Sequence, residues 1–240
     1  MLWVKPKLLL HKRILSLASS ISIEEAKDRI LLGKRSLGLT QSKKSIEKTA
    51  YHEAGHALTS ILQENYPYSF YKVTILPRGS ALGVSFSLPK DDEVGFSKEQ
   101  LEACIIVSMA GRAAEVVKFG HIHTGAVSDF MNATEIAKKM VLAYGMGKLT
   151  GEISFINPKK ISNEHPWVSN ETAKNIDFDI KEILNNCYNK AIEILKKEEK
   201  KLEILSKELL IKETLIAKEV YDLLNIPFNE NNEKILLQDN

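Results

Sequence analysis

The sequence has 240 residues, of which 44% are hydrophobic, so the chain can bury one sizeable core or two small ones. Its formal net charge of only +2 argues against a protein that binds nucleic acid through a basic surface. No stretch approaches the roughly 18–20 consecutive apolar residues that a membrane span requires, which predicts a soluble chain.

The two cysteines, Cys104 and Cys187, lie far apart and have no C-x-x-C spacing. This pattern favours reduced, buried thiols over a disulfide or a thiolate zinc site. It fits a protein of the cytoplasm or of an organelle matrix.

Residues 1–21 form a basic segment that contains no acidic residue. Its apolar run at 8–10 is too short for a secretory signal. Such a segment can be an organelle-import sequence, a membrane-surface segment or a structural helix, and we favour the helix because short basic stretches are common and unspecific.

The apolar spacing predicts a helix over residues 46–62. Two strands follow, over 71–76 and 82–88, joined by a turn that contains proline and glycine. Ser97 with Gln100 three residues later forms a capping box, which predicts a helix from there to Gly120.

A further helix is expected from Ser128 to Gly145, followed by a long connection over 146–168. Apolar residues then recur at helical spacing over 173–194, and this helical region is predicted to continue through 202–209 and 215–223. The polar tail from residue 229 is expected to be flexible. The sequence therefore predicts a mainly α protein with one small β-sheet.

The pattern H-E-x-x-H occurs at residues 52–56, inside the first predicted helix. Residues four apart lie on one helix face, so the imidazoles of His52 and His56 can reach the same metal ion. Glu53 is placed to accept a proton from a water molecule that zinc has acidified. The pattern can also arise by chance around packed histidines, but its apolar flanks indicate a buried site and favour the catalytic interpretation.

The third ligand is not determined by this pattern. The longer motif H-E-x-x-H-x-x-G-x-x-H is excluded because Thr59 and Leu62 stand at its last two positions. A nearby glutamate ligand is also excluded, since no acid lies between residues 64 and 91. Asp129 is the best candidate because it lies in the first turn of a predicted helix behind a glycine-containing loop, although an acid there can simply cap the helix. His121, His123 and Glu115 are the competing candidates.

The run T-A-Y-H-E-A-G-H-A-L at 49–58 resembles the peptidase domain of the FtsH family, membrane-anchored ATP-dependent zinc proteases. The similarity extends over about residues 22–226. Further matching motifs follow in that family's order: I-L-P-R-G at 75–79, A-L-G at 81–83, G-R-A-A-E at 111–115, T-G-A at 124–126, Asp129, A-T at 133–134, M-V at 140–141, and E-T-L at 213–215.

The resemblance implies a zincin-type active-site helix followed by a C-terminal helical bundle. It also implies that Zn²⁺ is bound by His52, His56 and Asp129, with Glu53 as general base. In the family, a strand near the metal pairs with an extended substrate. The residues implied here are Val73, Thr74, Ile75 and Leu76, which also read as an ordinary core strand.

Family members degrade unfolded polypeptides at the cytoplasmic side of a membrane, as hexameric rings that carry an ATPase. This sequence lacks the phosphate-binding motif G-x-x-x-x-G-K-[ST] and resembles the proteolytic part alone. A homo-hexamer, or a ring with ATPase-bearing relatives, is the assembly implied. Two departures lie close to the site: Ser128 stands where the family usually has Asn, and Val127 is unusual in that loop.

These observations divide the chain into a basic segment (1–21), a zinc metallopeptidase core (22–168), a C-terminal helical part of the same domain (169–228) and a flexible tail (229–240). The expected function is a zinc-dependent endopeptidase acting on loosely structured proteins. The alternative is a non-catalytic module that builds or regulates rings with ATPase-bearing relatives. The presence of Glu53 counts against it, because a structural module has no use for a general base.

Overall fold

A computed structural model describes residues 42–77, 81–90, 95–156 and 168–228. The predictions for the basic segment 1–21, the part of the family resemblance over 22–41, residues 78–80 of the predicted turn, residues 157–167 of the long connection and the tail (229–240) lie outside these ranges.

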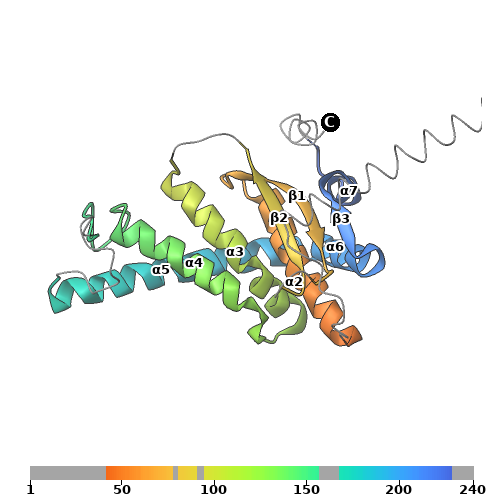
Figure 1. The fold of residues 1–240 in the computed structure, drawn as a ribbon, viewed down its shortest axis with the longest axis horizontal. Coiled ribbons are helices and arrows are strands. Elements are labelled where there is room, and N and C mark those ends of the chain that lie inside the picture. Colours follow the sequence, from red (N-terminus) through yellow and green to blue (C-terminus); the bar gives the residue numbers. More distant parts are fainter. Residues whose placement is uncertain (1–41, 78–80, 91–94, 157–167, 229–240) are drawn as a thin grey trace, which may run out of the picture.

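The described part is mainly helical with a small antiparallel sheet, as predicted (Figure 1). Labels follow Figure 1. The elements in chain order are α2 (Lys43–Leu62), β1 (Tyr68–Thr74), β2 (Val84–Pro89), α3 (Lys98–Phe119), the 3-10 turn η1 (Thr124–Ala126), α4 (Val127–Leu142), α5 (Asn170–Lys197), α6 (Glu199–Lys212), β3 (Thr214–Ile216) and α7 (Ala217–Leu223).

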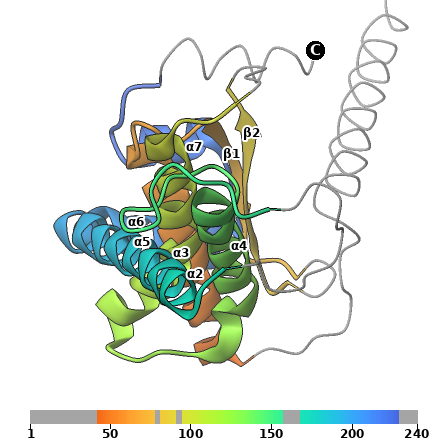
Figure 2. The same cartoon turned by 90° about the vertical axis from the view of Figure 1, so that its left-hand side faces the viewer.

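Helix α2 lies at the centre of the molecule, between the sheet on one side and α3 and α6 on the other (Figures 1 and 2). Its inner faces carry small side chains, including Ala50, Ala54 and Ala57, all fully buried. At Gly55 a β-carbon would fall 2.6 Å from the carbonyl oxygen of Ala110, so only glycine allows this approach of α2 to α3. The close packing sets the distance between α2, which carries two residues of the predicted site, and α3.

Helix α3 begins and ends where the sequence predicts. The Ser97 hydroxyl accepts a hydrogen bond from the Gln100 backbone, and the Gln100 side chain accepts one from the Ser97 backbone, which completes the capping box. Gly120 ends the helix in the left-handed conformation, with φ of 67°. Helix α3 then packs against α4 and the long helix α5 on its far side (Figure 2).

The sheet has the strand order β2-β1-β3 with antiparallel pairing throughout. The predicted strand over 71–76 is shifted, because pairing begins at Tyr68 and ends at Thr74. The continuous helical region expected over 215–223 is wrong at its start. Glu213 ends α6 with φ of 61°, and residues 214–216 pair with β1 before α7 begins. A three-residue strand is too short to show a period, and its pairing with β1 outweighs the surrounding helical pattern.

Side chains from α2 to α7 share one hydrophobic core. Leu195 of α5, Leu205 of α6 and Val220 of α7 are fully buried in it together with Leu58 of α2. The C-terminal helices therefore pack directly behind the helices that carry the predicted site. No helix in the described ranges combines the length and apolarity needed to cross a membrane.

Candidate metal centre

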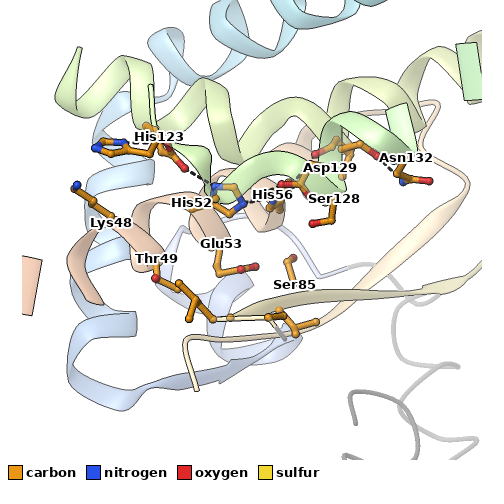
Figure 3. A pocket seen from close by; sticks show the side chains of 18 of the residues that line it. Lys48, Thr49, His52, Glu53, His56, Ser85, His123, Ser128, Asp129 and Asn132 are labelled. Carbon is orange, nitrogen blue, oxygen red and sulfur yellow. Dashed lines mark hydrogen bonds and ion pairs between the residues drawn. The ribbon is translucent and has the colours of Figure 1, made fainter. Parts of the chain in front are cut away.

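Three side chains from two helices converge on one point. His52 and His56 lie one turn apart on α2, with their Nε2 atoms 3.2 Å apart. Asp129, in the first turn of α4, places Oδ2 3.1 Å from Nε2 of His52 and 3.6 Å from Nε2 of His56 (Figure 3). Ligands held at about 2.0–2.1 Å in a tetrahedron around zinc lie roughly 3.3 Å apart. Both the separations and the N, N, O donor set therefore fit a zinc ion with an open fourth position.

The other ring nitrogens fix the tautomer of each histidine. Nδ1 of His52 donates to Oε1 of Glu115 at 2.7 Å, and Nδ1 of His56 donates to the carbonyl oxygen of Val107 at 2.7 Å. Because each Nδ1 carries the hydrogen and donates it to an acceptor on α3, each Nε2 has a lone pair that it can offer to the metal. Helix α3 thus orients both candidate ligands.

The pKa shifts of His52 and Asp129 indicate the same preference for a positive charge. Burial alone would lower the pKa of His52, but hydrogen bonds with Asp129 and Glu115 raise it to about 10. Burial would raise the pKa of Asp129, yet the two histidines hold it well below its usual range. Both shifts show that the carboxylates of Asp129 and Glu115 favour a positive charge at this point.

Gly111 of α3 leaves the space that the two imidazoles occupy. A β-carbon there would fall 2.5 Å from Nε2 of His56 and 2.6 Å from Nε2 of His52. These distances are far below van der Waals contact. Any larger residue at position 111 would displace the ligand atoms themselves.

Glu53 lies beside the ligands and is 7% exposed. Burial raises the pKa of Glu53, whereas the nearby histidines and a hydrogen bond from the backbone N–H of Ser85 lower it in part (Figure 3). A β-carbon at Gly83 would fall 2.7 Å from Cγ of Glu53, so the loop before β2 can close over this carboxylate only with glycine. A carboxylate with a raised pKa in a pocket is suited to accept and return a proton near neutral pH.

The competing ligand candidates occupy other positions. Glu115 contacts the nitrogen of His52 that faces away from the metal point, and His123 contacts Glu115 at 3.2 Å. His121 is exposed and does not line the cavity. Among the described residues, His52, His56 and Asp129 are the group whose donor atoms could hold a metal ion.

The two departures from the family pattern have no direct contact with the metal point. Ser128 does not cap α4, which begins at Val127 with no side-chain cap. Ser128 lines the cavity instead. The Val127 side chain is 60% exposed and lies on the opposite face of α4, toward Phe130 and Lys138.

The ligands and Glu53 line an open cavity of about 740 Å³. Residues 81–85, Ser87 and the turn that contains Thr124 and Gly125 complete its wall. Within the described residues β2 is an edge strand, and it runs along this wall.

The residues predicted to bind substrate do not line the cavity: Val73, Thr74, Ile75 and Leu76. Val73 and Thr74 pair with β2 on one side and β3 on the other, and Val73 is fully buried. The Ile75 backbone N–H donates to the carbonyl oxygen of Glu213. The prediction of a pairing edge is therefore wrong for Val73 and Thr74, because β3 already occupies the second side of β1. The alternative interpretation of these residues, an ordinary core strand, is confirmed for Val73 and Thr74.

Sequence reasoning missed the roles of Glu115, Val107 and Ser85. Glu115 stands four residues after Gly111 and therefore lies on the same face of the predicted helix. This spacing could have indicated that Glu115 faces the same neighbours as Gly111. Val107 and Ser85 contribute backbone atoms, which every residue type has, so the sequence could not have indicated their roles.

Comparison with known proteins gives consistent matches over this region. The model of peptidase family M41 matches residues 39–223. An ATP-dependent zinc metalloprotease FtsH of Borreliella burgdorferi (strain ZS7) is 40% identical over 226 residues, covering 90% of this chain and 35% of that protein. The chloroplastic/mitochondrial ATP-dependent zinc metalloprotease FTSH 11 of Arabidopsis thaliana is 40% identical over 208 residues, covering 86% of this chain and 25% of that protein. The chain spans about a third or less of the length of these relatives.

Proposed function

The chain belongs to peptidase family M41, and from this premise we propose that it is a zinc-dependent endopeptidase that cleaves unfolded or loosely structured proteins. The observation that carries the proposal is the convergence of His52, His56 and Asp129 within 3.1–3.6 Å, beside a buried carboxylate. The relatives named above are zinc metalloproteases, which supports zinc as the metal.

When bound at this point, zinc supplies a Lewis acid for the scissile carbonyl and lowers the pKa of the attacking water to about 7. The protein's own part is proton transfer. Glu53 takes the proton from the attacking water as the tetrahedral centre forms, and can then deliver it to the leaving amine nitrogen. Burial, which raises the pKa of Glu53, favours both the uptake and the return of the proton.

The free edge of β2 is the surface that best suits an extended substrate. Val84, Ser85 and Ser87 of this strand line the cavity, and the backbone of Ser85 donates a hydrogen bond to Glu53. A peptide added along this edge would be held by main-chain hydrogen bonds, which accept many side-chain sequences. A substrate must be extended to pair with β2, so a stably folded protein cannot bind along this edge.

Ring assembly, as a homo-hexamer or with ATPase-bearing relatives, is part of the same proposal. Large apolar side chains are exposed around the start of α4, namely Ile122, Val127 and Met131. A second exposed group follows α4 and continues onto α5: Tyr144, Leu149, Ile153, Ile156 and Phe178. Groups of exposed large apolar side chains can mark contacts between subunits. The same surface would serve the alternative function, an assembly module without catalysis.

Zinc content and casein hydrolysis, measured on the wild-type chain and on Glu53→Gln, separate the two functions. The amide has the shape of the carboxylate but cannot accept a proton, so Glu53→Gln should bind one zinc per chain and lose about a hundredfold to ten-thousandfold in kcat. Equal activity of both proteins would refute the mechanism. A wild-type protein that binds zinc and cuts nothing would favour the assembly module.

A further inference from the structure

The carboxylate of Glu115 is shared between two histidines. Its Oε1 accepts from Nδ1 of the ligand His52 at 2.7 Å, and its Oε2 lies 3.2 Å from Nδ1 of His123. The Glu115 side chain is 5% exposed. A buried carboxylate is costly unless its oxygens are hydrogen-bonded, so each histidine fixes one half of the group.

Arg112 holds His123 by its main chain. The guanidinium donates a hydrogen bond to the carbonyl oxygen of His123, and its Nε lies 3.9 Å from Oε2 of Glu115. The same guanidinium lies over the ring of Phe130, 5.0 Å from its centroid. Arg112 and Glu115 are three residues apart on α3, so one face of that helix binds both the ring and the backbone of His123.

His123 is also the residue that precedes the turn leading to the third ligand. The turn η1 follows directly, and α4 then presents Asp129 in its first turn, next to Phe130. Figure 3 shows His52 with His123 on one side and Asp129 on the other. His123 therefore links Glu115, the hydrogen-bond partner of His52, to the segment that carries Asp129.

We propose that His123 is a positioning residue of the metal centre. Its ring holds Glu115 in the orientation that directs Nε2 of His52 to the metal, while its backbone anchors the segment that carries Asp129. The inference rests on the proposed function, since it assigns a role toward the zinc bound by these residues. Partners of this kind typically contribute about tenfold to a hundredfold to metal affinity.

Two variants isolate the ring. His123→Ala leaves Oε2 of Glu115 without its nearest donor and lets the carboxylate turn away from His52. His123→Asn places an amide N–H close to the position of Nδ1 and can restore the bond. His121→Ala is the matched control, because His121 is exposed in the same loop and lies outside the cavity lining.

The experiment measures zinc affinity by competition with a chromophoric chelator, the visible spectrum of the cobalt-substituted proteins, and the melting temperature of the metal-free proteins. His123→Ala should weaken zinc binding about tenfold to a hundredfold and alter the cobalt spectrum. His123→Asn should recover most of the zinc affinity and most of the wild-type spectrum. His121→Ala should match the wild type in both measurements.

Each contrary result has a distinct meaning. Wild-type affinity in His123→Ala would overturn the inference and leave the proposed function intact. Equal weakening in His123→Ala and His123→Asn would also overturn it, because the hydrogen bond would then not be the cause, whatever the melting temperatures. A wild-type chain that binds no zinc would refute the proposed function itself.

Discussion

The α-carbon of Gly111 lies so close to His56 that a methyl group on it would fall 2.5 Å from Nε2, the atom that we propose binds the metal. The contact comes from α3 and meets α2 at the point where both imidazoles turn toward Asp129. We expect Gly111→Ala to displace the ligand atoms and to weaken zinc binding by at least an order of magnitude, since carbon and nitrogen cannot approach below about 3 Å without strain. Chelator competition measures the loss.

Gly95→Ala is the control for this substitution, because a β-carbon at Gly95 meets nothing within 4 Å. It should leave zinc affinity unchanged. If Gly111→Ala binds zinc as tightly as the wild type, the described approach of α3 to the ligands is wrong.

The second prediction separates the third ligand from the residue that orients His52. Asp129→Ala removes one donor of three and should abolish stoichiometric zinc binding at neutral pH. Glu115→Gln keeps all three donors and can still accept from Nδ1 of His52, so it should retain one zinc per chain with an affinity reduced about tenfold to a hundredfold. Metal analysis after dialysis tests both. Full zinc in Asp129→Ala together with none in Glu115→Gln would move the ligand to Glu115.

The sequence predicts the helices of the site well because their signals are local. The capping box at Ser97 and the glycine at 120 mark both ends of α3, and the i, i+4 spacing of His52 and His56 defines one helix face. The order of strands in the sheet has no such local signal. Whether β1 or β2 offers the free edge depends on where Thr214–Ile216 docks, 140 residues away from Thr74 along the chain.

The same limit applies within the site. The loop motif T-G-A and the position of Asp129 mark the third ligand only through resemblance, because spacing alone leaves His121, His123 and Glu115 open. In the structure Asp129 lies at Nε2 of His52 and Glu115 at Nδ1, whereas His123 contacts Glu115 and His121 is exposed. This arrangement depends on the packing of Gly55 against Ala110 and on the ring orientation, and neither is encoded in a residue pattern.

The third prediction concerns the metal-free protein and pH. The folded chain keeps a proton on His52 with a pKa of about 10, whereas the ordinary value is 6.5. This bound proton stabilises the fold fully below pH 6.5, and the contribution is lost as the pH rises toward 10. The melting temperature of EDTA-treated protein should therefore fall between pH 6.5 and 10.

Two comparisons test whether His52 causes this fall in melting temperature with pH. His52→Asn removes the titrating group and should flatten it. Zinc should also remove it, because the metal replaces the proton and binds more tightly as the pH rises. Differential scanning fluorimetry at several pH values gives all three curves. A flat curve for the metal-free wild type would contradict the strong coupling of His52 to Asp129 and Glu115.

The fourth prediction is self-association through exposed apolar side chains. Met131 near the start of α4 is 66% exposed, and Phe178 on α5 is 51% exposed. If these surfaces join subunits, Met131→Glu or Phe178→Glu should reduce the assembly to smaller species, since a buried unpaired carboxylate opposes association. Lys196→Glu, on an exposed position elsewhere on α5, is the control. Light scattering after gel filtration measures the mass. A monomeric wild type at micromolar concentration would count against self-assembly and favour a partner-dependent ring.

The last prediction follows from the substrate edge and from the motifs present in these 240 residues. A peptide must be extended to pair with β2 and reach Glu53, and the sequence contains no G-x-x-x-x-G-K-[ST] loop that could bind ATP. A stable folded domain opens its backbone rarely, with a population set by an unfolding free energy of about 5–15 kcal/mol. We therefore expect the purified chain to cut casein and to spare a tightly folded reporter, with the same rates in the presence and absence of ATP. Glu53→Gln, incubated in parallel, shows whether any cleavage comes from a contaminant. Rapid, ATP-stimulated loss of the folded reporter with this chain as the sole added protein would mean that unfolding is not limiting here, and that the chain handles folded substrates by a route other than the β2 edge.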